Sequence, residues 1–289
     1  GHKAGEKLRR AFLRWHPLPK LQFNPELFEA CVTRCLQSWA SQRTKGDIQR
    51  AVASSEPDWN GDYTKLFLKA QTVKKIGKLY GPAAPGQIVT TFPLSRTLRD
   101  AAFATYVEHV LADHKPAHMY LHAKRTPADA AEWYEEHWTP GMGVTATDYT
   151  AWDTGCDEGF LSFDSWLMDR VGLPQWYIQE YQRGKVSTYC YAGQIPTMQF
   201  SGDRWTWLLN TYRNIAITAV RYRARPGTAC AFSGDDMILC GQLSPDPNFD
   251  ASEWKLTAKV TSGATDVFCG MRFGAPKLTM DPYTLYTRS

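Results

Sequence analysis

Residues 230–240 read CAFSGDDMILC, a run in which apolar side chains surround two adjacent carboxylates, Asp235 and Asp236. A buried charge is costly unless it is paired or coordinates a metal ion. Ser233, Gly234 and Asp235 form a turn signal between two apolar arms, so the segment predicts a β-hairpin. Its tip would place Asp235 at the mouth of a sheet, where this carboxylate can face bound cations.

A second acidic segment, TATDYTAWDTGCD (145–157), supplies a partner for that tip. It places Asp148 at the end of an apolar strand and Asp153 five residues later. Carboxylates on two adjacent strands could hold two Mg²⁺ ions roughly 3.5–4 Å apart, the arrangement used for in-line phosphoryl displacement. Taken alone, either segment is better explained as an acidic turn or a helix cap, without a metal.

A third segment, FSGDRWTWLLNT (200–211), lies between these two in the chain. Its Ser201-Gly202 pair predicts a loop able to approach a ligand closely. Thr206, Asn210 and Thr211 follow at helical spacing, on roughly one face. Alone, they would read as the polar positions of an amphipathic helix.

Composition and charge set the class of protein. The 289 residues are 43% hydrophobic and 21% charged, which is typical of a globular chain, and no apolar run is long enough for a membrane-spanning helix. The chain begins GHKAGEKLRR, without an initiator Met, so we expect a fragment of a longer protein. Residues 1–100 carry 17 Lys and Arg against 8 Asp and Glu, which indicates a basic part suited to polyanions.

The predicted elements alternate along the chain and indicate an α+β fold with a mainly antiparallel sheet. Helical spacing and caps predict helices over 24–40, 95–113, 126–138, 158–172 and 204–223. Alternation or β-branched runs predict strands over 87–92, 143–152 and 185–193, with the hairpin over 228–240.

The three segments resemble, in order and spacing, motifs A, B and C of viral RNA-dependent RNA polymerases. The motifs read Asp148-x4-Asp153, then Ser201-Gly202-x3-Thr206-x3-Asn210-Thr211, then Ser233-Gly234-Asp235-Asp236. The chain is most similar to the alphavirus-like supergroup and, within it, to tymovirus- and flexivirus-like (Tymovirales) replicases. The stretch FLKAQTVKK…PGQIVTTF resembles their motif F and VFCGMRF their motif E, so the resemblance runs from about residue 65 to 280.

The resemblance implies a right-hand polymerase fold with an antiparallel-sheet palm (an RRM-like core) and fingers. Residues 1–140 would form the fingers, with the fingertip motif F near 65–92. Residues 141–275 would form the palm, with a fingers insertion near 170–200. Residues 276–289 would only begin a thumb, so the thumb would be truncated or absent.

The resemblance also implies roles at the metal site. Asp148 and Asp235 would ligate two Mg²⁺ ions, with Mn²⁺ as an alternative metal, and Asp236 would be a secondary ligand. Lys255 or Lys259 would supply the motif D general acid that protonates the leaving pyrophosphate. The sequence does not decide between these two lysines.

Further implied roles concern the nucleotide and the template. Asp153, Asn210 and the adjoining Thr211 would recognise the ribose 2′-hydroxyl, which distinguishes RNA from DNA. Positioning of template and nucleotide would fall to Ser201, Gly202 and Thr206. Lys69, Lys74 and Lys75 would meet the triphosphate and the entering template.

The implied function is the RNA-dependent RNA polymerase of a positive-strand RNA virus replicase. A reverse transcriptase shares the paired aspartates but has no use for recognition of the 2′-hydroxyl. A third hypothesis is a catalytically silent RNA-binding or scaffold fragment, because the thumb is missing. Expected partners are the RNA template and product strand, nucleoside triphosphates, and other replicase domains or subunits. The expected location is the host cytoplasm, in a membrane-associated replication complex.

Overall fold

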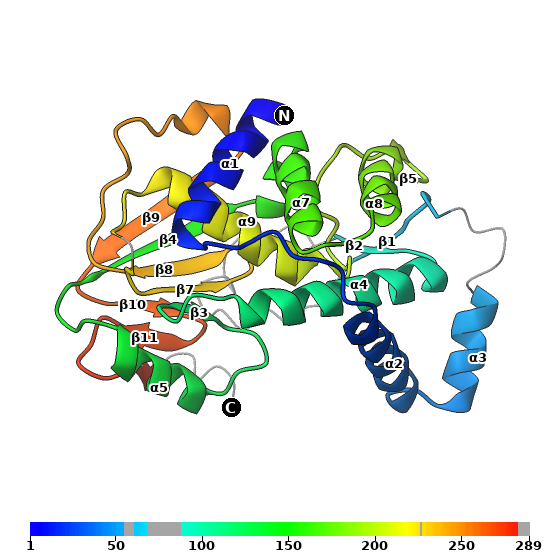
Figure 1. Cartoon of the computed structure of the whole chain (residues 1–289), viewed down its shortest axis with the longest axis horizontal. Helices are drawn as coiled ribbons and strands as arrows, with labels where there is room; N and C mark the ends of the chain where they lie inside the picture. The colour runs from blue at the N-terminus through cyan, green and yellow to red at the C-terminus, as the bar shows by residue number, and fades with distance from the viewer. Residues whose placement is uncertain (55–60, 69–87, 226, 283–289) are drawn as a thin grey trace, which may run out of the picture.

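A five-stranded sheet lies at one end of the computed structural model, which describes residues 1–54, 61–68, 88–225 and 227–282 (Figure 1). The strands are ordered β3-β7-β8-β4-β9. Their bounds are Met119–Leu121 for β3, Cys230–Ser233 for β7, Asp236–Cys240 for β8, Val144–Thr150 for β4 and Thr257–Gly263 for β9. Every neighbouring pair is antiparallel except β3 and β7, which run parallel.

Helices cover one face of this sheet. They are α1 (His2–Trp15), α7 (Glu158–Arg170) and α9 (Thr206–Arg221). Leu8 and Phe12 of α1 are fully buried in one cluster with Ile215 of α9 and Met237 and Leu239 of β8. Because side chains alternate along a strand, Met237 and Leu239 mark this face of β8.

The opposite face packs on α5 (Pro127–His137) and on a small sheet ordered β10-β11-β12. The strands of the small sheet are β10 (Asp266–Phe268), β11 (Met271–Phe273) and β12 (Thr279–Met280). Val144 and Ile238 of the main sheet are buried there against Tyr134, Phe268 and Phe273. The sheet is therefore covered on both faces where the strands are apolar.

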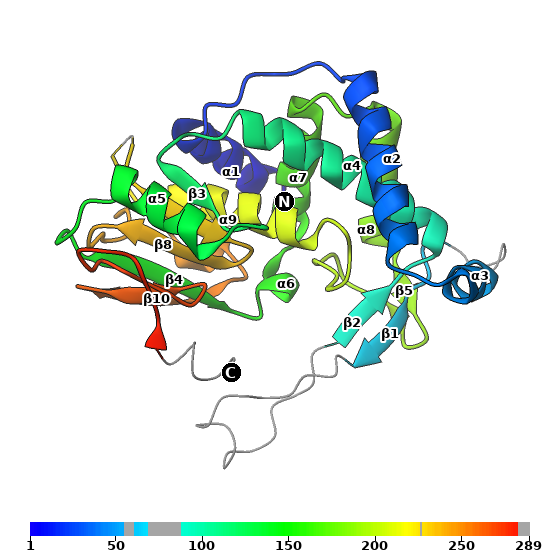
Figure 2. The same ribbon diagram turned by 90° about the horizontal axis from the view of Figure 1, so that it is seen from below.

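Apart from α6, which follows β4, and the 3₁₀ turn η2, whose Glu253 pairs with Lys7 of α1, the remaining elements lie toward the other end of the molecule (Figures 1 and 2). There the β1–β2 pair, α2 and α3 are far from the five-stranded sheet, and α4 runs between the two ends. The bounds are α2 (Pro25–Ser41), α3 (Lys45–Ser54), β1 (Lys65–Leu68), β2 (Ile88–Thr91), α4 (Leu94–Asp113), α6 (Trp152–Gly155), α8 (Gln175–Ser187), β5 (Tyr189–Cys190), β6 (Gly193–Gln194) and the 3₁₀ turn η2 (Ala251–Glu253).

Local signals account for most of these elements. The side chain of Asn24 caps α2, and Thr126 caps α5 in a reciprocal capping box with Asp129. The predicted helices near 95–113, 158–172 and 204–223 are confirmed, as are the hairpin and the antiparallel sheet.

One strand prediction was wrong in its first half. Residues 185–187 continue helix α8, and the rest of the segment is a short hairpin in which Tyr189–Cys190 pairs with Gly193–Gln194. Lys185 is drawn into the helix because its ammonium group is buried against Asp203, a tertiary contact that outweighs the strand propensity of the alternating sequence. Separately, β3 lies in the segment predicted as fingers but joins the sheet predicted as palm.

Candidate active site

The acidic turn lies between β7 and β8. Gly234 has a φ of +61°, a left-handed conformation that glycine adopts without the strain of a side chain. Helix α9 holds this glycine on both sides: its N–H donates to Oγ1 of Thr211 at 2.9 Å, and its carbonyl accepts from Nδ2 of Asn214 at 3.2 Å. These two hydrogen bonds fix the turn against the helix. The next residue, Asp235, is half-buried and is held in place with the turn.

Strand register brings Asp148 to the same edge of the sheet. Thr147 of β4 pairs with Met237 of β8, so the adjoining Asp148 lies alongside Asp236. On its other side, Asp148 is the direct cross-strand partner of Lys259 on β9. Directly opposed residues project to one face with their Cβ atoms about 4.5–5.5 Å apart. Asp148, Asp236 and Lys259 are all exposed.

Electrostatics link three of the predicted carboxylates. Burial raises the pKa of Asp235, and the negative charges of Asp153 and Asp148 raise this pKa further. Like charges held together in this way oppose each other's ionisation, and a bound cation relieves the opposition. Asp148, Asp153 and Asp235 thus lie in one electrostatic neighbourhood.

The donor chemistry of this edge fits Mg²⁺, a hard cation that prefers carboxylate oxygens. Among the described residues, no three His, Cys, Asp or Glu side chains form a ready-made metal cluster. Proteins commonly bind Mg²⁺ through one or two carboxylates, with water and substrate phosphates as the other ligands. Asp148 and Asp235 are the two carboxylates here that could share an ion in this way.

Asp153 is joined to two residues of the third motif. Its Oδ1 accepts from Nδ2 of Asn210 at 3.1 Å, and its Oδ2 accepts a short hydrogen bond from the Ser201 hydroxyl. Its carbonyl accepts from the backbone N–H of Gln199 at 2.9 Å. The predicted convergence of Asp153 and Asn210 is present, Ser201 joins it, and the contacts link α6 to α9 and the loop before it.

A buried network behind Asn210 was missed by the sequence interpretation. Oδ1 of Asn210 accepts from the Arg213 guanidinium at 3.1 Å, and Arg213 also donates to Oε1 of Gln199 at 2.9 Å. Arg213 forms an ion pair with Asp164 of α7, and both side chains are almost fully buried. Loss of one partner from such a pair typically costs about 3–5 kcal/mol. A signal was available: an acidic residue on the apolar face of the predicted helix over 158–172.

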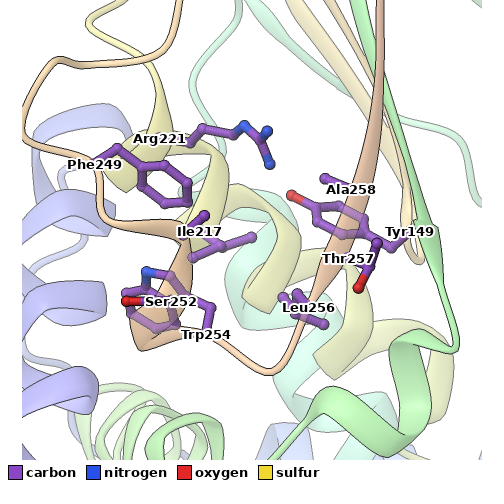
Figure 3. A pocket seen from close by; sticks show the side chains of 10 residues that line it. Tyr149, Ile217, Arg221, Phe249, Ser252, Trp254, Leu256, Thr257 and Ala258 are labelled. Atoms are coloured by element: carbon purple, nitrogen blue, oxygen red, sulfur yellow. The ribbon is translucent and has the colours of Figure 1, made fainter.

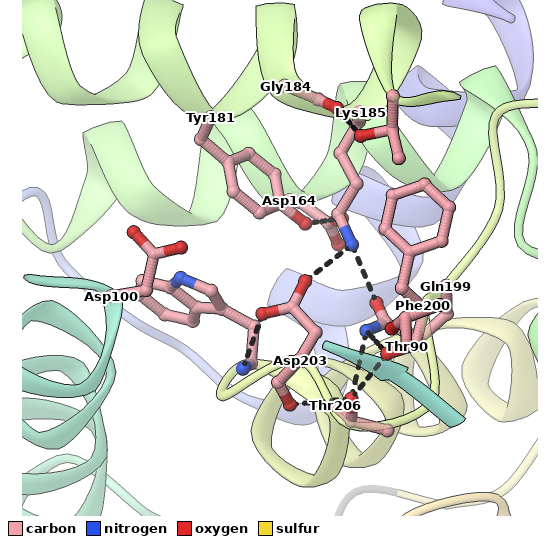
Figure 4. Close-up of polar contacts among 12 residues, drawn as sticks. Thr90, Asp100, Asp164, Tyr181, Gly184, Lys185, Gln199, Phe200, Asp203 and Thr206 are labelled. Atoms are coloured by element: carbon pink, nitrogen blue, oxygen red, sulfur yellow. Dashed lines mark hydrogen bonds and ion pairs between the residues drawn. The ribbon is translucent and has the colours of Figure 1, made fainter. Parts of the chain in front are cut away.

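Thr206 and Asp203 secure the loop before α9 (Figure 4). The Thr206 hydroxyl donates to the carbonyl oxygens of Phe200 and Asp203, and accepts from Nε2 of Gln199 at 3.0 Å. Burial alone would raise the pKa of Asp203, but the Lys185 ammonium group, 2.8 Å away, holds this pKa below its usual value. The Thr206 hydroxyl is therefore occupied in shaping the loop.

Gly202 approaches backbone more closely than a side chain would allow. Its φ is +101°, and a Cβ atom there would lie 2.6 Å from the carbonyl oxygen of Thr90. The same strand is hydrogen-bonded to the loop, since the N–H and the hydroxyl of Thr90 both donate to the Ser201 carbonyl. Gly202 therefore allows the loop to pack closely on β2, and its close approach to a ligand stays a prediction.

The family of this chain follows from comparison with known proteins. Residues 84–273 match the family model described as RNA dependent RNA polymerase, and this range contains all the acidic and polar site residues described above. The chain belongs to this polymerase family. It is 32% identical to the RNA replication protein of Botrytis virus F over 288 residues and 28% identical to the RNA-directed RNA polymerase of Apple chlorotic leaf spot virus over 286 residues.

These relatives are much longer proteins. The polymerase chain matches them over 99% and 98% of its own length but spans only 15% of each. A further relative, from Citrus leaf blotch virus, is an RNA replication polyprotein, of which the chain spans 13%. Among the helices that the structure describes, none is both long and apolar enough to cross a bilayer.

The structure separates the lysines predicted for the polymerase. Lys259 faces Asp148 across β4 and β9, whereas Lys255 precedes β9 and lies 3.7 Å from the carboxylate of Asp157. The lysines predicted for the triphosphate and template entry lie outside the described residues; they are Lys69, Lys74 and Lys75.

Proposed function

We propose that this chain is the catalytic core of an RNA-directed RNA polymerase from the replicase of a positive-strand RNA virus. Its family membership supports the reaction class, and one observation carries the assignment to this site. That observation is the convergence of Asp148 and Asp235 at one sheet edge beside the hydrogen-bonded pair of Asp153 and Asn210. The first pair suits metal-assisted phosphoryl transfer, and the second suits a ribose hydroxyl.

The proposed architecture is a right hand. The sheet with the acidic hairpin would be the palm over residues 141–275, with the strand β3 added from the N-terminal part. Residues 1–140 would otherwise form fingers, and 170–200 would return to them. Residues 276–289 would begin a thumb.

The proposed reaction joins the 3′ oxygen of the growing RNA to the α-phosphorus of a nucleoside triphosphate. The bond from that phosphorus to the pyrophosphate oxygen breaks at the same centre. Asp148 and Asp235 would hold the Mg²⁺ or Mn²⁺ ions, and Asp236 would support them. When bound, these ions would make the 3′ hydroxyl more acidic and offset the charge that develops on the phosphate.

Lys259 would donate the proton that the leaving pyrophosphate takes up. Its register opposite Asp148 places it on the same face as the metal carboxylates, which supports this role. Lys255 would remain structural, because it is paired with Asp157. A positively charged group near the pyrophosphate would also offset its charge.

Asp153 and Asn210 would orient the ribose of the incoming nucleotide, and Ser201 would fix the Asp153 carboxylate. A site built to hydrogen-bond a substrate hydroxyl rejects the analogue that lacks it. This arrangement favours an RNA polymerase over a reverse transcriptase. Thr206, Gly202 and Thr211 would act by shaping the loop and the turn around the nucleotide, with Lys69, Lys74 and Lys75 meeting the triphosphate and template.

The partners would be template and product RNA, nucleoside triphosphates and the other parts of a longer replication protein. Relatives that are polyproteins of several times this length support the last of these. The site of action would be the host cytoplasm, within a membrane-associated replication complex.

Primer extension on an RNA template separates the candidate functions. With Mg²⁺ present, the polymerase should extend an RNA primer with ribonucleotides and much less with deoxyribonucleotides. Equal or better extension with deoxyribonucleotides would indicate a reverse transcriptase. RNA binding without extension by either set would indicate a silent scaffold.

A further inference from the structure

A cavity of about 460 Å³ lies on the helical face of the sheet, behind the acidic edge (Figure 3). Its walls come from β4, the end of α9 and the segment from 249 to 258. Ile217, Phe249 and Leu256 give it apolar surfaces. The Tyr149 hydroxyl and the Arg221 guanidinium add polar groups to its lining, as Figure 3 shows. None of the described residues that line it is acidic.

Three buried donors at this cavity lack hydrogen-bond partners within the described chain. They are the Tyr149 hydroxyl, Nε1 of Trp254 and Nε of Arg221. Tyr149 and Trp254 are only 6% and 8% exposed. Tyr149 lies near Arg221 and Thr218, but neither makes a hydrogen bond of good geometry with it. Buried polar groups without partners are rare, so three at one cavity require an explanation.

The charge at the cavity has one sign. Arg221 forms no salt bridge among the described residues, and its guanidinium stands 5.2 Å from the ring centroid of Phe249. Burial raises the pKa of Tyr149, so its hydroxyl remains a donor at neutral pH. Water could satisfy these donors but would leave the apolar walls unmatched. A ligand that suits the whole cavity therefore has an apolar body and one anionic, acceptor-rich end.

We propose that this cavity is a binding site for small organic carboxylates with an aromatic or short aliphatic body. The carboxylate accepts a hydrogen bond from Tyr149 and pairs with Arg221, while the body packs on Ile217 and Leu256. The occupant lies on the opposite side of β4 from Asp148 and away from the proposed nucleotide site. The proposal therefore stands independently of the proposed polymerase activity.

The test titrates 2-naphthoate into the intact chain and follows the ligand by saturation-transfer NMR. A ligand of this size at ordinary efficiency binds with a Kd of about 1 mM. The neutral isostere 2-naphthamide should bind at least tenfold more weakly, because it lacks the charge-assisted bonds.

Two variants and one matched control locate the site. Arg221→Gln should weaken naphthoate binding about tenfold or more, and Tyr149→Phe, which removes one hydroxyl, about 3- to 10-fold. Arg223→Gln changes an arginine two residues along that pairs with Asp246 outside the cavity, and should leave binding unchanged. The proposal is overturned by equal binding of acid and amide, by equal effects of the two arginine variants, or by no saturable binding up to about 5 mM.

Discussion

The amide group of Asn210 has a defined orientation because both of its ends are engaged. Its oxygen accepts from Arg213, and its nitrogen donates to Asp153. Arg213 is itself held by Asp164, so the positions of Asn210 and Asp153 depend on a buried charge pair on two helices. A side chain fixed in this way can distinguish a sugar hydroxyl from a hydrogen atom, because its amide group cannot rotate to form another hydrogen bond when the hydroxyl is missing.

Asn210→Ala should reduce discrimination between sugars. The change should cost roughly 1–3 kcal/mol with ribonucleotides and much less with 2′-deoxynucleotides. The measurement is the ratio of kcat/KM for GTP to that for dGTP on one RNA template. Asn214→Ala, one turn further on α9, is the matched control and should slow both nucleotides alike. An unchanged ratio in Asn210→Ala would mean that this residue only packs the helix.

The two lysines give a second prediction at the same scale. Lys259→Met should lower kcat by about tenfold or more, as general acid catalysis contributes at least that much. Lys255→Met should change kcat little, because it removes only a surface pair with Asp157. Single-turnover rates of nucleotide addition measure both. Equal rates in the two variants would remove the proton-donor role from Lys259.

Helix α9 is the element that organises the site. Its first turn shapes the loop through Thr206, its second holds Asp153 through Asn210, and Thr211 and Asn214 fix the turn that carries Asp235. Three motifs that are far apart in the chain therefore share one rigid support. Their geometry should respond together to small changes on this helix.

Thr211→Val tests the support without altering side-chain volume much. The N–H of Gly234 would lose its acceptor, a loss worth about 1–3 kcal/mol for a buried group. We expect nucleotide addition to fall by roughly tenfold for every nucleotide, with RNA binding nearly unchanged, and Thr211→Ser to restore the rate. Full activity in Thr211→Val, or no rescue by Ser, would show that this hydrogen bond does not position the turn.

Helix α1 supplies a pH-dependent part of the stability. His16, at its C-terminal end, is fully buried with its ring stacked on Phe12, and burial lowers its pKa to about 4. The unfolded chain, with a histidine pKa of 6.5, binds this proton more readily, so the folded state should lose stability as pH falls from 6.5 towards about 4.

His16→Leu should remove this acid sensitivity. In the wild type, the histidine contributes a loss of at most about 1.4 kcal/mol per pH unit within the window. Urea unfolding at pH 7, 6 and 5 measures it. The prediction fails if the pH dependence of the unfolding free energy is the same in both proteins.

The parts of the fold that could be predicted from the sequence are those with local signals. Caps and periodicity predicted α2, α4, α7 and α9, and the turn residues predicted the β7–β8 hairpin, because each signal lies within a few residues. The convergence of Asp153 with Asn210 followed from motif order. The parallel pairing of β3 with β7 could not be predicted, because a three-residue strand carries no periodicity and its partner lies 111 residues away. The same holds for the Arg213–Asp164 pair, which joins residues 49 apart.

The distribution of charge along the chain predicts how RNA binding depends on salt. The basic balance of residues 1–100 predicts that phosphate contacts supply most of the affinity, so binding should weaken steeply with salt. For a single-stranded RNA, a plot of log Kd against the logarithm of the salt concentration should be a straight line with a positive slope of several. A flat plot would show that the basic part does not bind the backbone. Chemistry at the acidic edge should be separable from this binding.

The catalytic role of the hairpin is tested most directly by comparing Asp235→Ala with Asp246→Ala, a half-buried aspartate paired with Arg223 away from the acidic edge. Nucleotide addition and RNA affinity are measured on the same primer and template with Mg²⁺. We expect Asp235→Ala to abolish addition while RNA affinity changes less than about threefold, and Asp246→Ala to retain both. Nucleotide addition by a folded Asp235→Ala protein at the wild-type rate, or its loss of folding and RNA binding together, would contradict the catalytic role of the hairpin.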